Sequence, residues 1–459
     1  MQSENFIFGG GAAETRLHVL VAVGMFIAIY FILVLPRNKA IVPFLLSFFT
    51  IPLAQVVLVG PLHFPVLRIL ILAGLVRVFS GGFALGDKFP GGFNTVDRAI
   101  VLWAVSGLIV VSLQWMELQG LIKFVGDFLD SLGGYLVVRF LIPNRETVRR
   151  TIKTMALICV IQGVCMVSEQ STHQNVFGIF GANQPTIREG HVRSEGALGT
   201  LYGGTFAGVS IPLFLWLWTE EKSKMTAAAG IIGATAMVFA SHASTSWLAY
   251  GSSLLGLSFW LVRKQMRLIR WGIVATLIGL HLVMHGPVWS LIEKVDLTGG
   301  SSSYHRYMLV DNCIRHFSDW WLLGYKNYGN WGFDMWDLCN QFVVAALTGG
   351  LITLIFFIMV YSRSFGLIGK TRKRVEGNRA QEWFLWCLGS TLFANVVASF
   401  GINYMVQLQM SLFPLLACIS IAASSAKRTV VRKVDSTNEF LLGSTPHLAR
   451  NYLPLREIR

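Results

Sequence analysis

The chain has 459 residues, of which 54% are hydrophobic and only 14% are charged. A soluble protein of this length carries far more charge, so the composition excludes an ordinary soluble domain and predicts an integral membrane protein. The formal net charge of +14 could favour nucleic acid. We expect no nucleic-acid partner, because the basic residues lie in short clusters beside apolar runs, as in proteins that face a lipid bilayer.

Apolar runs of about the length that crosses a bilayer follow one another along the chain. They lie near residues 17–36, 40–59, 62–79, 99–116, 124–142, 151–168, 199–218, 226–241, 244–262, 271–285, 341–362, 383–402 and 406–424. The sequence lacks the alternation of polar and apolar residues that marks the strands of a membrane barrel, so we expect an all-α, polytopic transmembrane helix bundle. The bundle would have about 12–13 spans. The count is twelve if one of the weaker apolar runs is re-entrant. Residues 1–426 would form the bundle, and residues 427–459 a basic cytoplasmic tail with little fixed structure.

The basic clusters predict the orientation of the bundle, because cytoplasmic loops carry an excess of Lys and Arg. The clusters lie near residues 37–39, 145–153, 263–270, 370–374 and 427–433. With these inside, two long connections face the other side of the membrane: residues 169–198, called the first outer segment, and residues 286–340, the second. Loops on a rigid scaffold carry function, so we expect the chemistry in these two segments.

The first outer segment contains arginines among glycines and acidic residues, in the stretches Arg188-Glu189-Gly190 and Arg193-Ser194-Glu195-Gly196. The planar guanidinium matches phosphate oxygens, and glycine lets a backbone approach a bulky group. Phosphate binding is therefore one interpretation. The alternative is that these arginines contact lipid headgroups or pair with Glu189 and Glu195.

Three charged residues, Asp127, Asp130 and Arg139, lie inside a predicted span. Charges within spans usually face the bundle interior. We interpret them as an internal ion pair that fixes helix packing rather than as catalytic groups.

The second outer segment is expected to contain an amphipathic helix. Ser301 to Ser303 could cap it, and its apolar stripe would comprise Tyr307, Val310, Ile314 and Phe317, with Arg306 on another face. A group of aromatic residues between Trp320 and Trp336, including Trp331, would either stack on sugar rings or anchor the chain at the membrane interface.

The second outer segment ends with Asp337, Cys339 and Asn340, just before an apolar run. A carboxylate at the mouth of a bundle can act as a general base, but it can also cap the following helix. Cys339 could in principle form a disulfide with Cys313; we expect none.

The order of these motifs resembles the bacterial O-antigen ligase and O-antigen (exopolysaccharide) polymerase superfamily, over roughly residues 127–400. Each motif is degenerate, so the resemblance depends on their order and topology. The motifs are the arginine stretch, Ser244-Thr245-Ser246-Trp247, His305-Arg306, Trp320-Trp321-Leu322-Leu323-Gly324-Tyr325, Asp337-Leu338-Cys339-Asn340-Gln341-Phe342 and Gly349-Gly350.

The resemblance implies a GT-C-like, metal-independent membrane glycosyltransferase without a cofactor. Its donor would be an undecaprenyl-pyrophosphate-linked glycan, and its acceptor a hydroxyl of a growing polysaccharide or an acceptor glycolipid. By motif position, Arg193 and Arg306 would hold the pyrophosphate with help from Arg188, and Asn340 and Trp331 would contact substrate. The resemblance also implies the bacterial inner membrane, with a large periplasmic loop and the active site facing the periplasm.

One departure from the family pattern concerns the base. Many ligases carry a His directly before the final Asn, where this chain has Cys339. Asp337 is therefore the first candidate for the base and His305 the second, and the missing His favours a polymerase over a ligase. The alternative from another class is a polytopic carrier that moves a glycan or another anionic solute without bond chemistry; a structural assembly subunit is a third.

Overall fold

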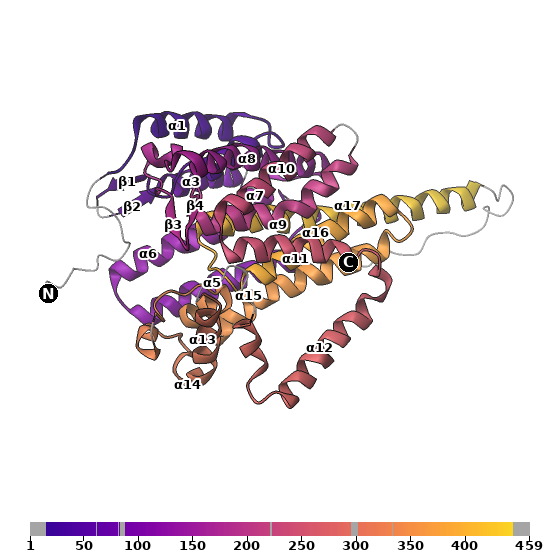
Figure 1. Cartoon of the computed structure of the whole chain (residues 1–459). Coiled ribbons are helices and arrows are strands. Elements are labelled where there is room, and N and C mark those ends of the chain that lie inside the picture. The colour runs from indigo at the N-terminus through magenta and orange to yellow at the C-terminus, as the bar shows by residue number, and fades with distance from the viewer. Residues whose placement is uncertain are drawn as a thin grey trace, which may run out of the picture.

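A computed structural model describes residues 15–60, 62–80, 82, 88–220, 223–294, 302–332 and 334–443. The fold is dominated by long helices that run alongside one another, with the 286–340 segment gathered around α13 and α14 at one end (Figure 1). The helices are α1 (Val19–Val34), α2 (Ile41–Thr50), α3 (Val66–Phe79), α5 (Thr95–Trp115), α6 (Leu118–Phe128), α7 (Gly134–Leu141), α8 (Arg145–Thr172), α9 (Thr200–Thr219), α10 (Lys224–Ser241), α11 (Ser244–Ser258), α12 (Met266–Val283), α13 (Ser302–Arg315), α14 (Phe317–Trp320), α15 (Gln341–Arg374), α16 (Arg379–Ala398) and α17 (Val406–Gly443).

Seven helices of the described chain are long and apolar enough to cross a membrane. They include α5, α8, α9 and α10, the segment 263–283 that contains α12, α15, and the first part of α17. The chain is therefore a multi-pass, helical membrane protein, as its composition predicts. The finer count of about 12–13 spans stays a prediction, because several expected runs form shorter helices, such as α1 and α2.

The apolar run at 40–59 is not one helix. Helix α2 has only 10 residues and ends at Thr50, just before Pro52, after which β1 (Val56–Val59) and β2 (Leu62–Pro65) form an antiparallel hairpin. Ten residues rise about 15 Å, half of the hydrocarbon thickness. Between α2 and the hairpin, buried Gln55 donates a hydrogen bond to the Phe180 carbonyl at 2.7 Å and accepts one from the His18 amide at 2.8 Å.

The centre of the bundle is built by α8 to α11 and α16. Helix α9 packs between α10 and α11, α10 also packs on α8, and α11 on α16. Helix α12 differs, because none of its side chains is buried and its main contacts are with the short 3-10 segments at its two ends. It stands apart from the other helices in Figure 1.

The charged residues inside the 124–142 run form ion pairs with other helices. Asp130 accepts two hydrogen bonds from Arg68 of α3, at 3.0 and 2.6 Å. Fully buried Arg139 of α7 pairs with fully buried Asp97 of α5 at 3.2 Å. Asp130 and Arg139 therefore join helices through ion pairs, as predicted, but each pairs with a residue outside the 124–142 run.

The 286–340 segment is fixed to the bundle by a break in α15. Gly350 has φ +66° and ψ −174°, a conformation that only glycine adopts readily. The turn at 320–325 fits into this break, where the Tyr325 amide donates to the Leu347 carbonyl and the Leu351 amide to the Trp321 carbonyl, both at 2.8 Å. Two motifs of the sequence, the Trp-Trp turn and Gly349-Gly350, therefore bind each other.

The amphipathic helix is present as α13, but its packed face differs from the expected one. Leu309 and Cys313 are buried, whereas Ile314 and Phe317 of the expected stripe are 46% and 45% exposed. Arg306 is three residues before Leu309, so it shares the packed face and points towards the bundle.

Two of the basic clusters, near residues 263–270 and 370–374, meet at the far end of α15. Helix α15 runs from the 286–340 segment to Arg374, and a cavity there is lined mainly by basic residues: Arg263, Lys264, Arg372, Lys373 and Arg379, together with Glu376, Gly377 and Glu382. The tail was expected to lack fixed structure, which is wrong for residues 427–443, because α17 continues as a helix to Gly443. The rest of the tail lies outside the described residues.

Candidate functional site

A cavity of about 450 Å³ lies where the 169–198 and 286–340 segments meet. It is lined by both segments and by the starts of α9 and α11, and its wall combines basic, acidic and imidazole side chains. The lining residues are Arg188, Glu189, His191, Arg193, Leu201, His242, Ser244, Trp247, His305, Arg306, Asp334, Asp337, Cys339 and Gly401. Five of the seven site residues predicted from the sequence are among them.

The first arginines of the cavity lie on a two-stranded hairpin, β3 (Thr186–Arg188) and β4 (His191–Arg193). Its two-residue turn, Glu189-Gly190, has φ +54° and +78°, the conformation that favours glycine in tight hairpins. Arg188 forms an ion pair with Glu189 at 3.4 Å, so part of the alternative interpretation, pairing within the segment, is observed for Arg188.

The end of α8 holds this hairpin in place. Fully buried Glu169 accepts hydrogen bonds from the amides of Glu195 and Gly196 at 2.7 and 2.9 Å. The side-chain nitrogen of Gln170 donates to the carbonyls of Val192 and Ala240 and to the Ser194 hydroxyl, at 2.8 to 2.9 Å. Arg193 is therefore carried by backbone that is hydrogen-bonded on both sides of it.

Arg193 is held in an environment that favours binding of an anion. Its Nε atom is buried and makes no hydrogen bond to any part of the chain that the structure describes. Burial lowers the pKa of Arg193 below the usual value for arginine, and the positive charge of Arg188 lowers it further. A negative ligand would stabilise both charges.

Arg306 reaches the same cavity from α13. Its guanidinium donates a hydrogen bond to the Thr245 hydroxyl at 3.0 Å, and that hydroxyl donates to the Gly401 carbonyl at 2.9 Å. Thr245 is fully buried in the first turn of α11. The Ser-Thr-Ser motif of the sequence therefore positions Arg306 through Thr245.

His305, Asp337 and Cys339 form a cluster beside Arg306, with possible ligand atoms within 4.8 Å of one another. The Nε2 atom of His305 lies 2.9 Å from the Asp337 carbonyl oxygen. Burial raises the pKa of the Cys339 thiol to about 11, and the negative charge of Asp337 adds to the shift. The thiol therefore keeps its proton at neutral pH, which makes it a poor base.

Asp337 is exposed at the cavity and does not cap α15. The cap is Asn340, whose side-chain oxygen accepts hydrogen bonds from the amides of Phe342 and Val343 at 2.9 and 3.2 Å. The capping alternative for Asp337 is therefore wrong.

Two predicted substrate-binding residues do not line the cavity. Asn340 is 1% exposed and its oxygen is used by the cap. Trp331 stacks on His316 and on Tyr325, with ring centroids 4.6 and 5.2 Å away. Its ring is therefore already engaged with two neighbouring side chains.

The cavity also contains residues that the sequence did not single out. His191 and His242 stack face to face, with ring centroids 4.8 Å apart. Burial lowers the pKa of His242, and His191 and Arg193 lower it further, so its imidazole is neutral at pH 7. His242 lies two positions before the Ser-Thr-Ser stretch. A single His before a helix belongs to no repeating pattern or motif, so the sequence alone did not mark it as a site residue.

Two comparisons of the sequence with known proteins identified no relative of this chain. No protein-family model matches the chain, and a search of curated proteins finds no match to its sequence.

Proposed function

We propose that this chain is a membrane glycosyltransferase that extends a cell-surface polysaccharide from an undecaprenyl-pyrophosphate-linked glycan donor. The observation that carries the proposal is the joining of Arg188, Arg193 and Arg306 in one cavity with Asp337 and His305. These residues come from segments far apart in the sequence, and the resemblance to the O-antigen ligase and polymerase superfamily assigns the same arginines to the pyrophosphate.

The charges of the cavity suit a pyrophosphate leaving group. Arg193 and Arg306 offer planar donors that can each bind phosphate oxygens with two hydrogen bonds. Their positive charge would stabilise the negative charge that develops on the pyrophosphate as its bond to the sugar breaks; such electrostatic stabilisation is usually the largest single contribution to catalysis.

The proposed reaction is a single displacement. The oxygen of an acceptor hydroxyl bonds to the anomeric carbon of the donor sugar, and the bond from that carbon to the pyrophosphate oxygen breaks with its electron pair remaining on the pyrophosphate. The hydroxyl proton passes to the carboxylate of Asp337, with His305 as the second candidate. The protonated thiol of Cys339, where ligases of the family carry His, favours a polymerase.

The arrangement of charge supports a periplasmic active site in the bacterial inner membrane. The arginine cavity lies at the start of α15, a helix of 34 residues, and the basic cavity around Arg372 and Lys373 lies at its end. Basic residues concentrate on the cytoplasmic side of inner-membrane proteins, so the arginine cavity would face the periplasm.

A carrier without bond chemistry is the alternative that the test must separate. Carriers bind their solute at helices broken near mid-membrane. Helix α15 is broken at Gly350, but the break is filled by backbone of the 320–325 turn. The arginines instead lie in the connecting segments, which favours the enzyme.

The test uses purified protein in proteoliposomes with lipid-linked oligosaccharide. An enzyme releases undecaprenyl pyrophosphate and produces longer lipid-linked glycans. A carrier moves intact donor between leaflets and lengthens no glycan, which would contradict the proposal.

A further inference from the structure

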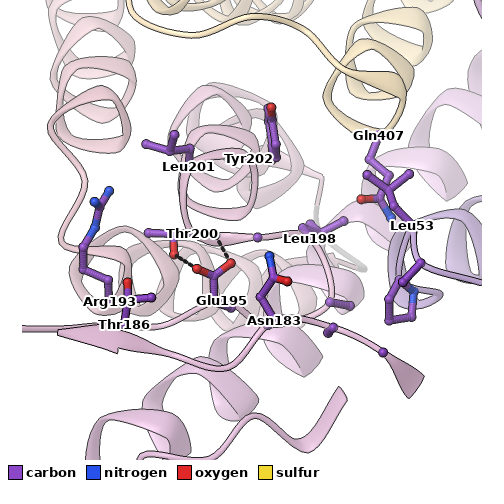
Figure 2. A pocket seen from close by; sticks show the side chains of 17 residues that line it. Leu53, Asn183, Thr186, Arg193, Glu195, Leu198, Thr200, Leu201, Tyr202 and Gln407 are labelled. Carbon is purple, nitrogen blue, oxygen red and sulfur yellow. Dashed lines mark hydrogen bonds between the residues drawn. The ribbon is translucent and has the colours of Figure 1, made fainter. Parts of the chain in front are cut away.

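A second cavity, of about 420 Å³, adjoins the arginine cavity and shares Arg193 and Leu201 with it (Figure 2). Its wall comes from the loop after α2, the loops on either side of the β3–β4 hairpin, the first turn of α9, and Gln407 in the first turn of α17. Its volume lies within the range of about 300–1,000 Å³ that is typical of ligand sites.

Two side chains of this second cavity, Glu195 and Gln407, present hydrogen-bond acceptors. Both oxygens of Glu195 already accept hydrogen bonds from Thr200, at 2.7 and 3.1 Å, as the dashed lines of Figure 2 show. A carboxylate oxygen has two lone pairs, so each can accept one bond more. The Asn183 amide lies close by on the loop below, and Gln407 enters from the opposite side (Figure 2).

Gln407 supplies an acceptor whose orientation is fixed. The side chain is 2% exposed, and its Nε2 atom donates to the carbonyl oxygens of Phe48 and Ile51, at 3.3 and 3.0 Å. Rotating the amide would place oxygen against both carbonyls. The Oε1 atom therefore remains the acceptor, and within the described residues it has no hydrogen-bond partner. A buried acceptor without a partner costs free energy that a ligand hydroxyl could recover.

We propose that the second cavity binds an uncharged pyranose unit of the glycan, the sugar next to the pyrophosphate. This inference rests on the proposed function. Hydroxyl groups can donate to Glu195 and Gln407 and can donate to or accept from the Asn183 amide. The carboxylate of Glu195 disfavours phosphate, and a prenyl chain would leave the Gln407 oxygen without a partner. Arg193 lines both cavities, so its guanidinium would lie beside the bond that joins the sugar to the pyrophosphate.

The test uses two probes on the full-length protein in nanodiscs. Methyl glycosides of glucose, galactose, mannose and N-acetylglucosamine report on the second cavity by saturation-transfer NMR, with methyl glucuronide as the charged comparison. Inorganic pyrophosphate, measured by calorimetry, reports on the arginine cavity. The variants are Asn183→Ala, which removes one hydrogen-bonding group, and Ala182→Trp, which fills the cavity from its loop. Asn330→Ala, an exposed Asn outside both cavities, is the matched control.

We expect at least one uncharged glycoside to bind, with glucuronide weaker by about tenfold or more. Asn183→Ala should weaken the glycoside about tenfold, the effect of one hydrogen bond, and Ala182→Trp should abolish its binding. Both variants should retain pyrophosphate binding, and the control should retain both ligands. Failure of every glycoside to bind, tighter glucuronide, or unchanged binding in Ala182→Trp would overturn the sugar site alone. Failure of the wild type to bind pyrophosphate would instead contradict the proposed function.

Discussion

Replacing Arg306 tests the anion site most sharply, because a hydrogen bond of defined geometry helps to position the side chain. Its guanidinium donates to the Thr245 hydroxyl at 3.0 Å while it lines the cavity with Arg193. Arg306→Lys keeps the charge but removes the planar arrangement of donors, so it cannot bind Thr245 and a phosphate oxygen in the same way. Arg306→Ala removes the charge as well.

The expected magnitudes follow from these lost interactions. A hydrogen bond involving a charged group contributes about 1.5–3 kcal/mol, and each 1.4 kcal/mol is a factor of ten, so Arg306→Lys should reduce turnover by roughly 10- to 100-fold. Loss of a group that stabilises developing negative charge costs about 10²- to 10³-fold, which we expect for Arg306→Ala. Thr245→Val, which leaves the arginine without this anchor, should cost about tenfold.

The assay measures polymer formed by purified variants from lipid-linked oligosaccharide, with membrane insertion and thermal stability measured in parallel. Arg315→Ala is the matched control, because Arg315 lies on the same helix, is 68% exposed and pairs with Asp311 away from the cavity. Near-normal polymer formation by well-folded Arg306→Ala protein would refute the assignment of Arg306 to the pyrophosphate. If Arg306 only contacts lipid headgroups, polymer formation should fall only slightly.

Four further predictions concern the base, the fold, the orientation and the metal. Asp337→Asn should fold and bind donor normally, with turnover reduced by roughly two to four orders of magnitude; full activity would move the role to His305. Gly350→Ala should lower the free energy of unfolding by at least about 1–3 kcal/mol in thermal melts, because φ is +66° and the new Cβ would lie 2.6 Å from a backbone oxygen, and an unchanged melt would contradict this. An impermeant thiol reagent applied from the periplasm, in a background without native Cys, should label a Cys at position 330 and not one at 372; the reverse would invert the topology. Chelators should leave the rate unchanged, whereas inhibition that added metal reverses would point to a cation at the cluster around Cys339.

The sequence predicted the helical architecture well, because long apolar runs have few alternatives in a membrane. It failed where the chain leaves the helix within an apolar run. Residues 40–59 contain Pro52 and the polar Gln55, and these mark the point at which the helix gives way to the hairpin. The tail failed in the opposite sense, since a polar and basic composition did not prevent α17 from continuing to Gly443.

The residues of the candidate site were predicted only in part. Arg193 became a candidate because arginine among glycines suits phosphate binding, whereas Arg306 was assigned only through the resemblance of its motif to the superfamily. Their common cavity depends on Thr245, a contact between segments that no local pattern encodes. Trp331 lies outside this cavity and stacks on His316 and Tyr325, which the sequence could not show, because composition cannot tell a free aromatic ring from one that packs on its neighbours.

The most direct test of the account is the stoichiometry of the reaction in nanodiscs, where a single bilayer disc has no second compartment and transport cannot be scored. Purified protein and lipid-linked oligosaccharide are incubated, and released undecaprenyl pyrophosphate and new glycosidic bonds are counted by mass spectrometry. The account predicts one undecaprenyl pyrophosphate released for each new glycosidic bond, with the rates of both reduced about 10²- to 10³-fold in Arg306→Ala. Intact donor and unlengthened glycan, from protein that still binds inorganic pyrophosphate, would contradict it.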